Sequence, residues 1–465
     1  MENFWDYNVW GTINLLAVLL GSLLLASMLR KSVPLLHNSL IPTSVLGGGI
    51  LIAVAAIYKL ITGEIMFDTA FFGGTGTAQL EILTYHCLAL GFIASAFKPS
   101  KSKLTKVRTT EIFNTGVTTV ATYLLQGIFG LAISILAAEV VTGFFPAAGV
   151  LLPFGYGQGT GQAMNYGAIF ENEYGFSGGK SFGLTIAALG FISASIGGVI
   201  YLNIMKHRGK IRVVPAGEAK AEQNAGHAPI REMIDKLTIQ ISLIFMAYLL
   251  AYFLMSGLGR LLPGMRSVIY GFNFLLGVLT ATLLKLLFNL LASKTAAHRD
   301  YTDAFLMTRA SNFFFDVMIV AGIAAIRFST IDRYWGILLI MGAVGLVITF
   351  VYNKFVAKVL FPNYTEEQFL AMYGMLTGTA STGIILLREI DGDFTSPASD
   401  NLVYQNFPAI VFGFPMMLLA TLAPKKPVPA TLIFTGLFVV MNLILFRSKL
   451  FRRHKKEQSE EIPDA

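Results

Sequence analysis

The chain has 465 residues, of which 54% are hydrophobic and only 13% are charged, and its mean hydropathy is +0.64. A soluble globular protein carries about a quarter charged residues, so this composition excludes that class. The formal charge of +8 is gathered in short clusters at the ends of apolar runs. That distribution is typical of cytoplasmic loops and argues against a nucleic-acid partner.

Apolar runs of about 20 residues recur along the chain, and each is long enough to cross a bilayer as a helix. In the first half we expect spans at 10–28, 40–61, 83–97, 112–138 and 182–205, with a broken region at 144–176. In the second half we expect spans at 238–257, 266–292, 304–326, 335–361 and 402–423, with a broken region at 364–394. A further apolar run, 429–446, has no counterpart in the first half.

These elements divide the chain into five segments. The segments are a first repeat (1–205), a basic cytoplasmic connector (206–237), a second repeat (238–424), an extra transmembrane helix (425–447) and a charged cytoplasmic tail (448–465). Because each repeat has five unbroken spans, an odd number, the two repeats must insert in opposite orientations. We therefore predict an all-α multi-pass membrane protein built from two inverted five-helix repeats, each with a re-entrant segment.

The basic clusters assign the sides of the membrane. Placing the N-terminus outside puts Arg30, Lys31, the cluster at 98–108, the connector and the C-terminal tail in the cytoplasm. Four basic residues fall on the opposite side: Arg260, Arg327, Lys425 and Lys426. With this topology the first broken region enters from outside and the second from the cytoplasm, so the two should meet near the bilayer midplane.

The two broken regions carry related sequences about 219 positions apart. The first has Gly159-Thr160-Gly161 leading through Glu171 to Gly175-Phe176, and the second has Gly378-Thr379-Ala380 leading through Glu389 to Asp393-Phe394. Helix-breaking tracts at matching places in two apolar halves indicate a secondary transporter whose binding site lies where the repeats meet.

The first tract, 154–162, has four glycines at alternate positions. Each glycine costs about 1 kcal/mol relative to alanine inside a helix, so we do not expect a regular helix interior here. Irregular backbone survives in a membrane only where it is buried in protein or lines a wet cavity, as at a re-entrant tip. The alternative is that the glycines let helices approach closely, which we expect at Ser195 and Gly197-Gly198 but not in this tract.

Free backbone groups and the start of a helix at each tip can bind an anionic solute. The candidate substrate-binding residues are Gly157, Gln158, Gly159, Thr160, Gly161 and Gln162 in the first tip and Gly378, Thr379, Ala380, Ser381 and Thr382 in the second. Hydroxyl, amide and carboxylate oxygens suit sodium. The candidate sodium ligands are Thr160, Thr377, Thr379, Ser311, Asn312 and Asp316.

Asp316 lies deep inside an apolar span, four residues after Asn312 on the same helix face. A carboxylate at the centre of a membrane helix costs several kcal/mol, which favours a functional role as a cation ligand or proton carrier. The alternative is a structural ion pair with Arg309 or Lys285. The acidic residues that follow the second tip, Asp391 and Asp393, are expected to end that segment in solvent.

The segment Ile41-Pro42-Thr43-Ser44-Val45-Leu46-Gly47-Gly48 resembles the Ile-Pro-x-Pro-Val-x-Gly-Gly opening of the second helix in bacterial sodium/glutamate symporters. The first tip, with the exit Glu173-Tyr174-Gly175-Phe176, is similar to their first re-entrant segment, although Gln158 stands where that family has histidine. The resemblance implies inverted five-helix repeats, sodium-coupled glutamate uptake, a bacterial inner-membrane location and a homodimer with an elevator-like carrier domain.

We therefore predict a sodium-coupled symporter for glutamate or a related small anionic amino or dicarboxylic acid, with Na⁺ as the coupling ion and no organic cofactor. The chain has no Ser/His/Asp or metal-ligand spacing that predicts an enzyme. Proton coupling through Asp316 is the alternative within carriers. An ion channel between the repeats and a membrane receptor that has lost transport are the alternatives from other classes.

Overall fold

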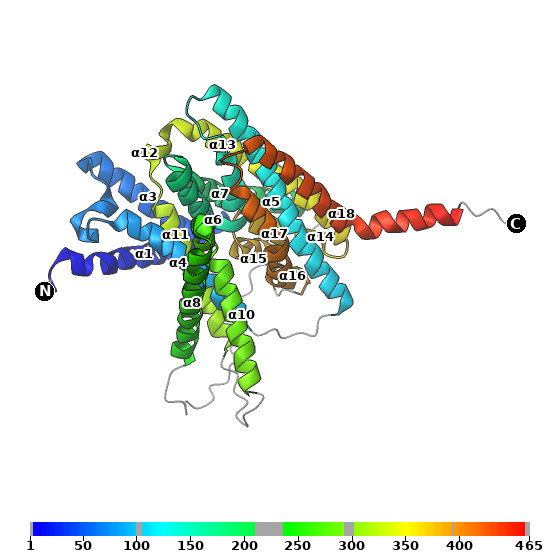
Figure 1. Ribbon diagram of the computed structural model, residues 1–465, viewed down its shortest axis with the longest axis horizontal. Coiled ribbons are helices and arrows are strands. Elements are labelled where there is room, and N and C mark those ends of the chain that lie inside the picture. The colour runs from blue at the N-terminus through cyan, green and yellow to red at the C-terminus, as the bar shows by residue number, and fades with distance from the viewer. Residues whose placement is uncertain (1–2, 99–104, 210–235, 293–301, 393–394, 461–465) are drawn as a thin grey trace.

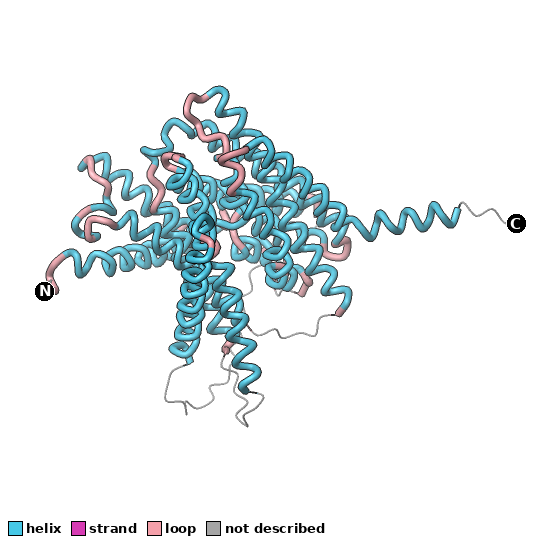
Figure 2. Tube along the Cα trace, viewed as in Figure 1, coloured by secondary structure: helices cyan, strands magenta, loops and turns pink. Residues whose placement is uncertain are grey.

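The computed structural model describes residues 3–98, 105–209, 236–292, 302–392 and 395–460. Within these residues the regular elements are helices (Figures 1 and 2). The first half contains α1 (Tyr7–Ser32), α2 (Pro34–Asn38), α3 (Thr43–Thr62), α4 (Gly76–Phe97), α5 (Lys106–Val140), α6 (Leu151–Tyr174) and α7 (Gly179–His207). Short 3-10 turns at Met66–Asp68, Ala70–Phe72 and Ala148–Val150 connect some of them.

The second half begins with α8 (Lys236–Leu261), and residues 210–235 of the expected connector lie outside the described residues. The other helices are α9 (Arg266–Gly271), α10 (Asn273–Ala292), α11 (Ala304–Ala324), α12 (Phe328–Ile331), α13 (Trp335–Leu360), α14 (Thr365–Thr377), α15 (Ala380–Arg388), α16 (Ala398–Tyr404), α17 (Asn406–Ala420) and α18 (Pro427–Glu460). Further 3-10 turns lie at Pro263–Met265 and Asp332–Tyr334. The last helix continues through 448–460, which the sequence assigns to a separate tail, and projects from the body of the protein (Figure 1).

Nine helices of the described chain are long and apolar enough to cross a membrane, and two bent pairs qualify as further spans. The pairs are α9 with α10, bent by 75°, and α16 with α17, bent by 50°. Each of the eleven expected unbroken spans coincides with one of these helices or pairs. The structure thus confirms an all-α protein of the multi-pass membrane class.

Two helices begin earlier than the sequence predicts, because charged residues near their starts have partners. The expected span 83–97 begins at Gly76 as α4, which includes Glu81. Glu81 Oε2 lies 2.7 Å from Lys180 Nζ on α7, so the carboxylate is compensated within the fold. The expected span 112–138 likewise begins at Lys106, and its Arg108 and Glu111 pair with each other.

Burial separates outer from central helices. Only 17% of the apolar window of α3 and 22% of those of α1, α8 and α18 are buried inside the protein, against 67% for α7. The outer helices therefore offer large apolar side chains, such as Leu60, Tyr252 and Leu432, to a surrounding bilayer. Most residues of α6 and α14 are buried, so these two helices of the broken regions lie largely in the interior.

The helices form two groups that draw on both halves of the chain. In the first group α1 packs on α3, α8 packs on α10, and α4 and α11 pack on each other, with α10 against α4 and α3 against α11. Figure 1 shows α8 and α10 side by side as a projecting pair. In the second group α5 packs on α6, α17 and α18, α13 packs on α14, and α7 contacts α6, α13 and α14. This second group holds the two broken regions.

Candidate functional site

The first break is a single residue, Gly159, inside α6. Its backbone angles, φ 79° and ψ −170°, are accessible essentially only to glycine. The helix resumes directly at Thr160, so the amides of the following turn point toward the break. We call Gly159 the first break. At this position the backbone conformation itself requires glycine.

The structure corrects the expectation of an irregular backbone over 154–162, since the helix is regular on both sides of Gly159. The neighbouring glycines are sites of close packing, the role that the sequence interpretation assigned elsewhere. A Cβ atom at Gly155 would lie 2.7 Å from Ile186 Cγ2, one at Gly161 would lie 2.8 Å from Leu88 Cδ1, and one at Gly157 would overlap the ring of Tyr123.

The second break consists of Gly378 and Thr379, between the end of α14 and the start of α15. The expected irregular tract is again shorter in the structure, because Thr377 and Ala380 are helical. The two helices fold against each other through glycines: a Cβ atom at Gly374 would lie 2.8 Å from Gly383 Cα. This close packing forms a helical hairpin whose tip is the second break.

The two breaks lie in contact, which confirms the expectation that the broken regions meet. A Cβ atom placed on Gly159 would lie 3.3 Å from Thr379 Cγ2 and 3.6 Å from Gly378 O. Two helix starts, one after Gly159 and one at Ala380, therefore converge on one small region. Because the N-terminal end of a helix carries a partial positive charge, this region favours an anion.

Two buried amide nitrogens beside the first break have no hydrogen-bond partner among the described residues: Gln158 Nε2 and Gln162 Nε2. The orientation of Gln162 is fixed by its neighbours. Asn165 Nδ2 donates to Gly271 O at 3.3 Å and to Gln162 Oε1 at 3.2 Å. Since a carbonyl oxygen can only accept, Asn165 presents its nitrogen, Gln162 must present its oxygen to it, and the Gln162 nitrogen faces elsewhere. The site therefore holds hydrogen-bond donors in need of an acceptor.

Both broken regions are tied to the same residue of α7, Ser193. Tyr156, on the first, lies 2.8 Å from Ser193 Oγ through its hydroxyl and also donates to Gly342 O at 2.6 Å. Tyr373, on the second, donates its hydroxyl to Ser193 O at 2.8 Å. These bonds hold the two breaks in one relative position.

The candidate residues at the breaks differ in exposure. Thr160, Gln162, Gly378 and Thr382 are buried, Gln158, Thr379 and Ser381 are half-buried, and Ala380 is exposed. The partly exposed members lie around the second break, so the contact can be reached from one side. Three of the predicted sodium ligands lie here: Thr160, whose Oγ1 is 3.4 Å from Met318 O, Thr377, whose hydroxyl donates to Tyr373 O, and Thr379, 3.4 Å from Thr382.

The other predicted sodium ligands lie on α11 and point in different directions. Ser311 is buried, with its hydroxyl 2.8 Å from Ser95 Oγ and 3.0 Å from Gly91 O on α4. Asn312 and Asp316 share a face of α11, as expected. That face is exposed, and Ser44 of α3 lies beside Asp316. Residues two apart on a helix face nearly opposite ways, so Asp316 points away from Met318, the residue that Thr160 contacts.

Neither cation proposed as an ion-pair partner of Asp316 is placed for that role. Arg309 lies with its guanidinium carbon 5.1 Å from the centre of the Phe305 ring. Lys285 donates from Nζ to the backbone oxygen of Lys98 at 2.6 Å. The structure thus favours neither a pair with Arg309 nor one with Lys285.

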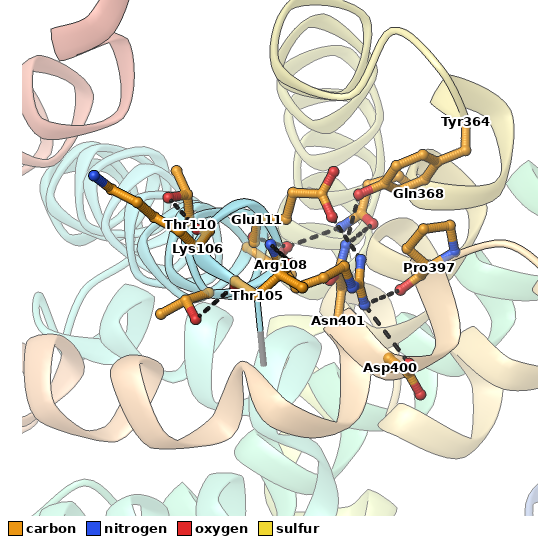
Figure 3. A network of polar contacts seen from close by, with 12 residues as sticks. Thr105, Lys106, Arg108, Thr110, Glu111, Tyr364, Gln368, Pro397, Asp400 and Asn401 are labelled. Carbon is orange, nitrogen blue, oxygen red and sulfur yellow. Dashed lines mark hydrogen bonds and ion pairs between the residues drawn. The ribbon is translucent and has the colours of Figure 1, made fainter. Parts of the chain in front are cut away.

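A polar network around the start of α5 was not anticipated from the sequence (Figure 3). Arg108 Nη1 lies 2.5 Å from Glu111 Oε2, and its Nη2 lies 3.3 Å from Pro397 O. Asn401 of α16 donates to Gln368 Oε1 and to Tyr364 OH, both at 3.0 Å. Because Gln368 in turn donates to Thr115 of α5 at 3.2 Å, the network fastens the base of the second hairpin to α5 and α16.

Asp391, just beyond that hairpin, is buried instead of ending in solvent as the sequence suggests, and Asp393 lies outside the described residues. Burial alone would raise the pKa of Asp391. Hydrogen bonds from Ser396 N at 2.9 Å and from Thr395 N and Oγ1 at 2.8 and 3.0 Å outweigh it and hold the pKa below its usual value. The carboxylate thus organises the turn that leads to α16.

This geometry predicts a pH dependence. A carboxyl whose pKa is lower in the folded state stabilises the protein above its unfolded-state pKa, and this contribution is lost as the pH falls through the folded-state value. We expect Asp391→Ala to lower the unfolding temperature at pH 7 and to have no further effect once acid has protonated the wild-type carboxyl. Thermal unfolding of both proteins across pH measures this, and a constant difference at all pH values would contradict it.

Comparison with protein-family models finds no match to this chain, and comparison with curated proteins finds no match either.

Proposed function

We propose that this chain is a sodium-coupled symporter for a small anionic solute, glutamate or a related amino or dicarboxylic acid. The observation that carries the proposal is the pair of unpartnered amide nitrogens, on Gln158 and Gln162, beside the contact between the two breaks. A buried donor without an acceptor costs about 1–3 kcal/mol. A bound carboxylate would supply acceptors for both nitrogens and recover that energy.

The helix starts at the breaks support the same charge for the solute. A partial positive charge at each helix end adds attraction for a carboxylate, and the protein side chains at the contact are neutral amides and hydroxyls. The exposed position of Ala380 and the half-buried positions of Thr379 and Ser381 leave a route for the solute to reach the breaks.

The pairing of helices supports a two-repeat architecture. If α1, α3, α4, α5 and α6 correspond to α8, α10, α11, α13 and α14, the contacts recur in matching pairs. The contact α1–α3 matches α8–α10, α4–α10 matches α11–α3, and α5–α6 matches α13–α14. We infer inverted repeats, with the N-terminus outside and the C-terminus cytoplasmic, in a bacterial inner membrane.

Alternating access would move the second group of helices, which holds both breaks, against the first group, which contains α1, α3, α4, α8, α10 and α11. The shared bonds to Ser193 favour movement of the breaks as one body, since Tyr156 and Tyr373 fasten both broken regions to α7. This is an elevator-like cycle. The first group would stay fixed, with its exposed apolar faces against lipid or a second copy of the chain.

Uptake of radiolabelled glutamate into proteoliposomes tests the proposal. We expect accumulation above equilibrium with an inward sodium gradient and none when potassium replaces sodium. Accumulation driven by a pH gradient in sodium-free medium would show that the coupling ion is a proton and not sodium. If the folded protein binds and accumulates neither glutamate, aspartate nor succinate, the anionic-solute proposal is wrong.

A further inference from the structure

A second set of buried polar side chains lies between α5 and α13. Gln126 Nε2 donates to Thr349 Oγ1 at 2.8 Å, and Asn353 Nδ2 lies 3.4 Å from Thr122 Oγ1. All four side chains are at most 1% exposed. Thr122 and Gln126 are one turn apart on α5, as are Thr349 and Asn353 on α13, so the two cross-links close a ring around one small region. We call these four residues the amide ring.

The amide ring contains two oxygens with no hydrogen-bond partner among the described residues, Gln126 Oε1 and Asn353 Oδ1. Their identity as oxygens follows from the bonds of the companion nitrogens. Gln126 Nε2 donates to Leu376 O at 2.9 Å, and Asn353 Nδ2 donates to Thr349 O at 2.9 Å. Backbone carbonyls accept only, so turning either amide over would set two oxygens against each other. Both unpartnered atoms are therefore acceptors.

Acceptors outnumber donors in the ring. The Thr122 hydroxyl donates to Thr118 O at 2.8 Å, and both amide nitrogens are committed to backbone carbonyls. Only the Thr349 hydroxyl proton remains for the two unpartnered oxygens. A hard cation satisfies such a surplus of neutral oxygens, and within the described residues no group of three or more His, Cys, Asp or Glu offers a charged alternative.

We propose that the amide ring is a sodium site, with Gln126 Oε1, Asn353 Oδ1 and the hydroxyl oxygens of Thr122 and Thr349 as protein ligands. Sodium suits the site because it binds neutral oxygens and carries one charge that a membrane interior can accommodate only with such ligands. None of these four residues is among the sodium ligands predicted from the sequence.

The ring also touches the second hairpin. Gln126 donates to Leu376 O, and Leu376 is the second residue before the second break at Gly378. An ion that fixes the Gln126 amide would hold that carbonyl, and with it the end of α14, in the position that meets Gly159. The coupling of ion to solute rests on the proposed function, whereas sodium binding by the ring does not.

Thermal unfolding of the purified full-length protein tests sodium binding without solute. We expect NaCl, but not choline chloride or KCl at equal ionic strength, to raise the unfolding temperature of the wild type with a saturable dependence. Asn353→Leu should weaken the apparent sodium affinity about tenfold or more, since a ligand to a charge is lost. Thr349→Ser keeps the hydroxyl oxygen that accepts from Gln126 and should retain the sodium response of the wild type, as a ligand role requires.

Asn442→Leu on α18 is the matched control, because the hydrogen bonds of the Asn442 side chain go to Tyr352 and Phe438 and to none of the four ring residues. Its sodium response should equal that of the wild type. Thr349→Val keeps the side-chain shape and removes one oxygen, so it tests the site if Asn353→Leu fails to fold. A wild type insensitive to sodium, or an unchanged sodium response in Asn353→Leu and Thr349→Val, would overturn the site. Sodium-driven uptake that is indifferent to these variants would overturn the coupling role of the ring but leave the proposed function standing.

Discussion

Replacing Gly159 with valine is expected to abolish uptake while leaving the protein inserted and folded. The backbone at Gly159, φ 79° and ψ −170°, is closed to a β-branched residue, and holding a non-glycine residue there costs about 1–3 kcal/mol or more. The first atom of the new side chain would also press on Thr379, whose Cγ2 would lie 3.3 Å from it. The strain and the contact act together to separate the two breaks.

Gly49→Val is the matched control for that experiment. Gly49 lies in α3, where a Cβ atom would meet nothing within 4 Å, so the same substitution adds bulk in a membrane helix without strain or collision. We expect uptake by Gly49→Val to remain within about twofold of wild type, as for other substitutions on exposed surfaces. Size-exclusion chromatography checks that both purified variants elute as the wild type does, without aggregation. Normal uptake by Gly159→Val would refute the placement of the site at the breaks.

Replacing Gln162 with glutamate should weaken the affinity for the anionic solute about 100-fold or more. One carboxylate oxygen can still accept from Asn165 Nδ2, so the bond that orients residue 162 is retained. The other oxygen replaces the unpartnered nitrogen and sets a negative charge toward the proposed carboxylate. Like charges placed together at a desolvated site cost several kcal/mol, enough for that loss.

Equilibrium binding of glutamate measured by calorimetry checks this effect. Gln79→Glu, near the start of α4, introduces the same charge away from the breaks and should leave binding nearly unchanged. The one hydrogen bond described for the Gln79 side chain is to Thr75, on the same helix start. If Gln162→Glu binds glutamate as tightly as wild type, the Gln162 nitrogen does not face the solute.

The sequence by itself determined the class of the protein and the positions of its spans. Whether a segment crosses a membrane depends on its own length and apolarity, which are local properties, so all eleven expected spans reappear as helices or bent pairs. The errors at their ends have a tertiary cause. Glu81 and Arg108 look like loop residues in the sequence, but Lys180 and Asp400, which come from distant segments, compensate their charges.

The sequence also located the two breaks but could not assign the roles of their glycines. Gly155, Gly157, Gly159 and Gly161 look alike in the chain, and only the neighbours of each distinguish close packing from a backbone that requires glycine. The polar stripe of Thr115, Thr119, Thr122 and Gln126, spaced three or four apart within an apolar span, was the signal that could have drawn attention to α5.

Only the tertiary structure decided which polar atoms at these sites lack partners. The bond from Asn165 to Gly271, 106 residues away in the sequence, fixes the orientation of the Asn165 amide, and this in turn leaves the Gln162 nitrogen without a partner. The bond from the Gln126 nitrogen to Leu376 O, 250 residues away, likewise leaves the Gln126 oxygen without a partner. A hydrogen bond commits one atom of an amide and thereby aims the other, so the chemistry offered to a ligand is set by contacts between segments that are distant in the chain.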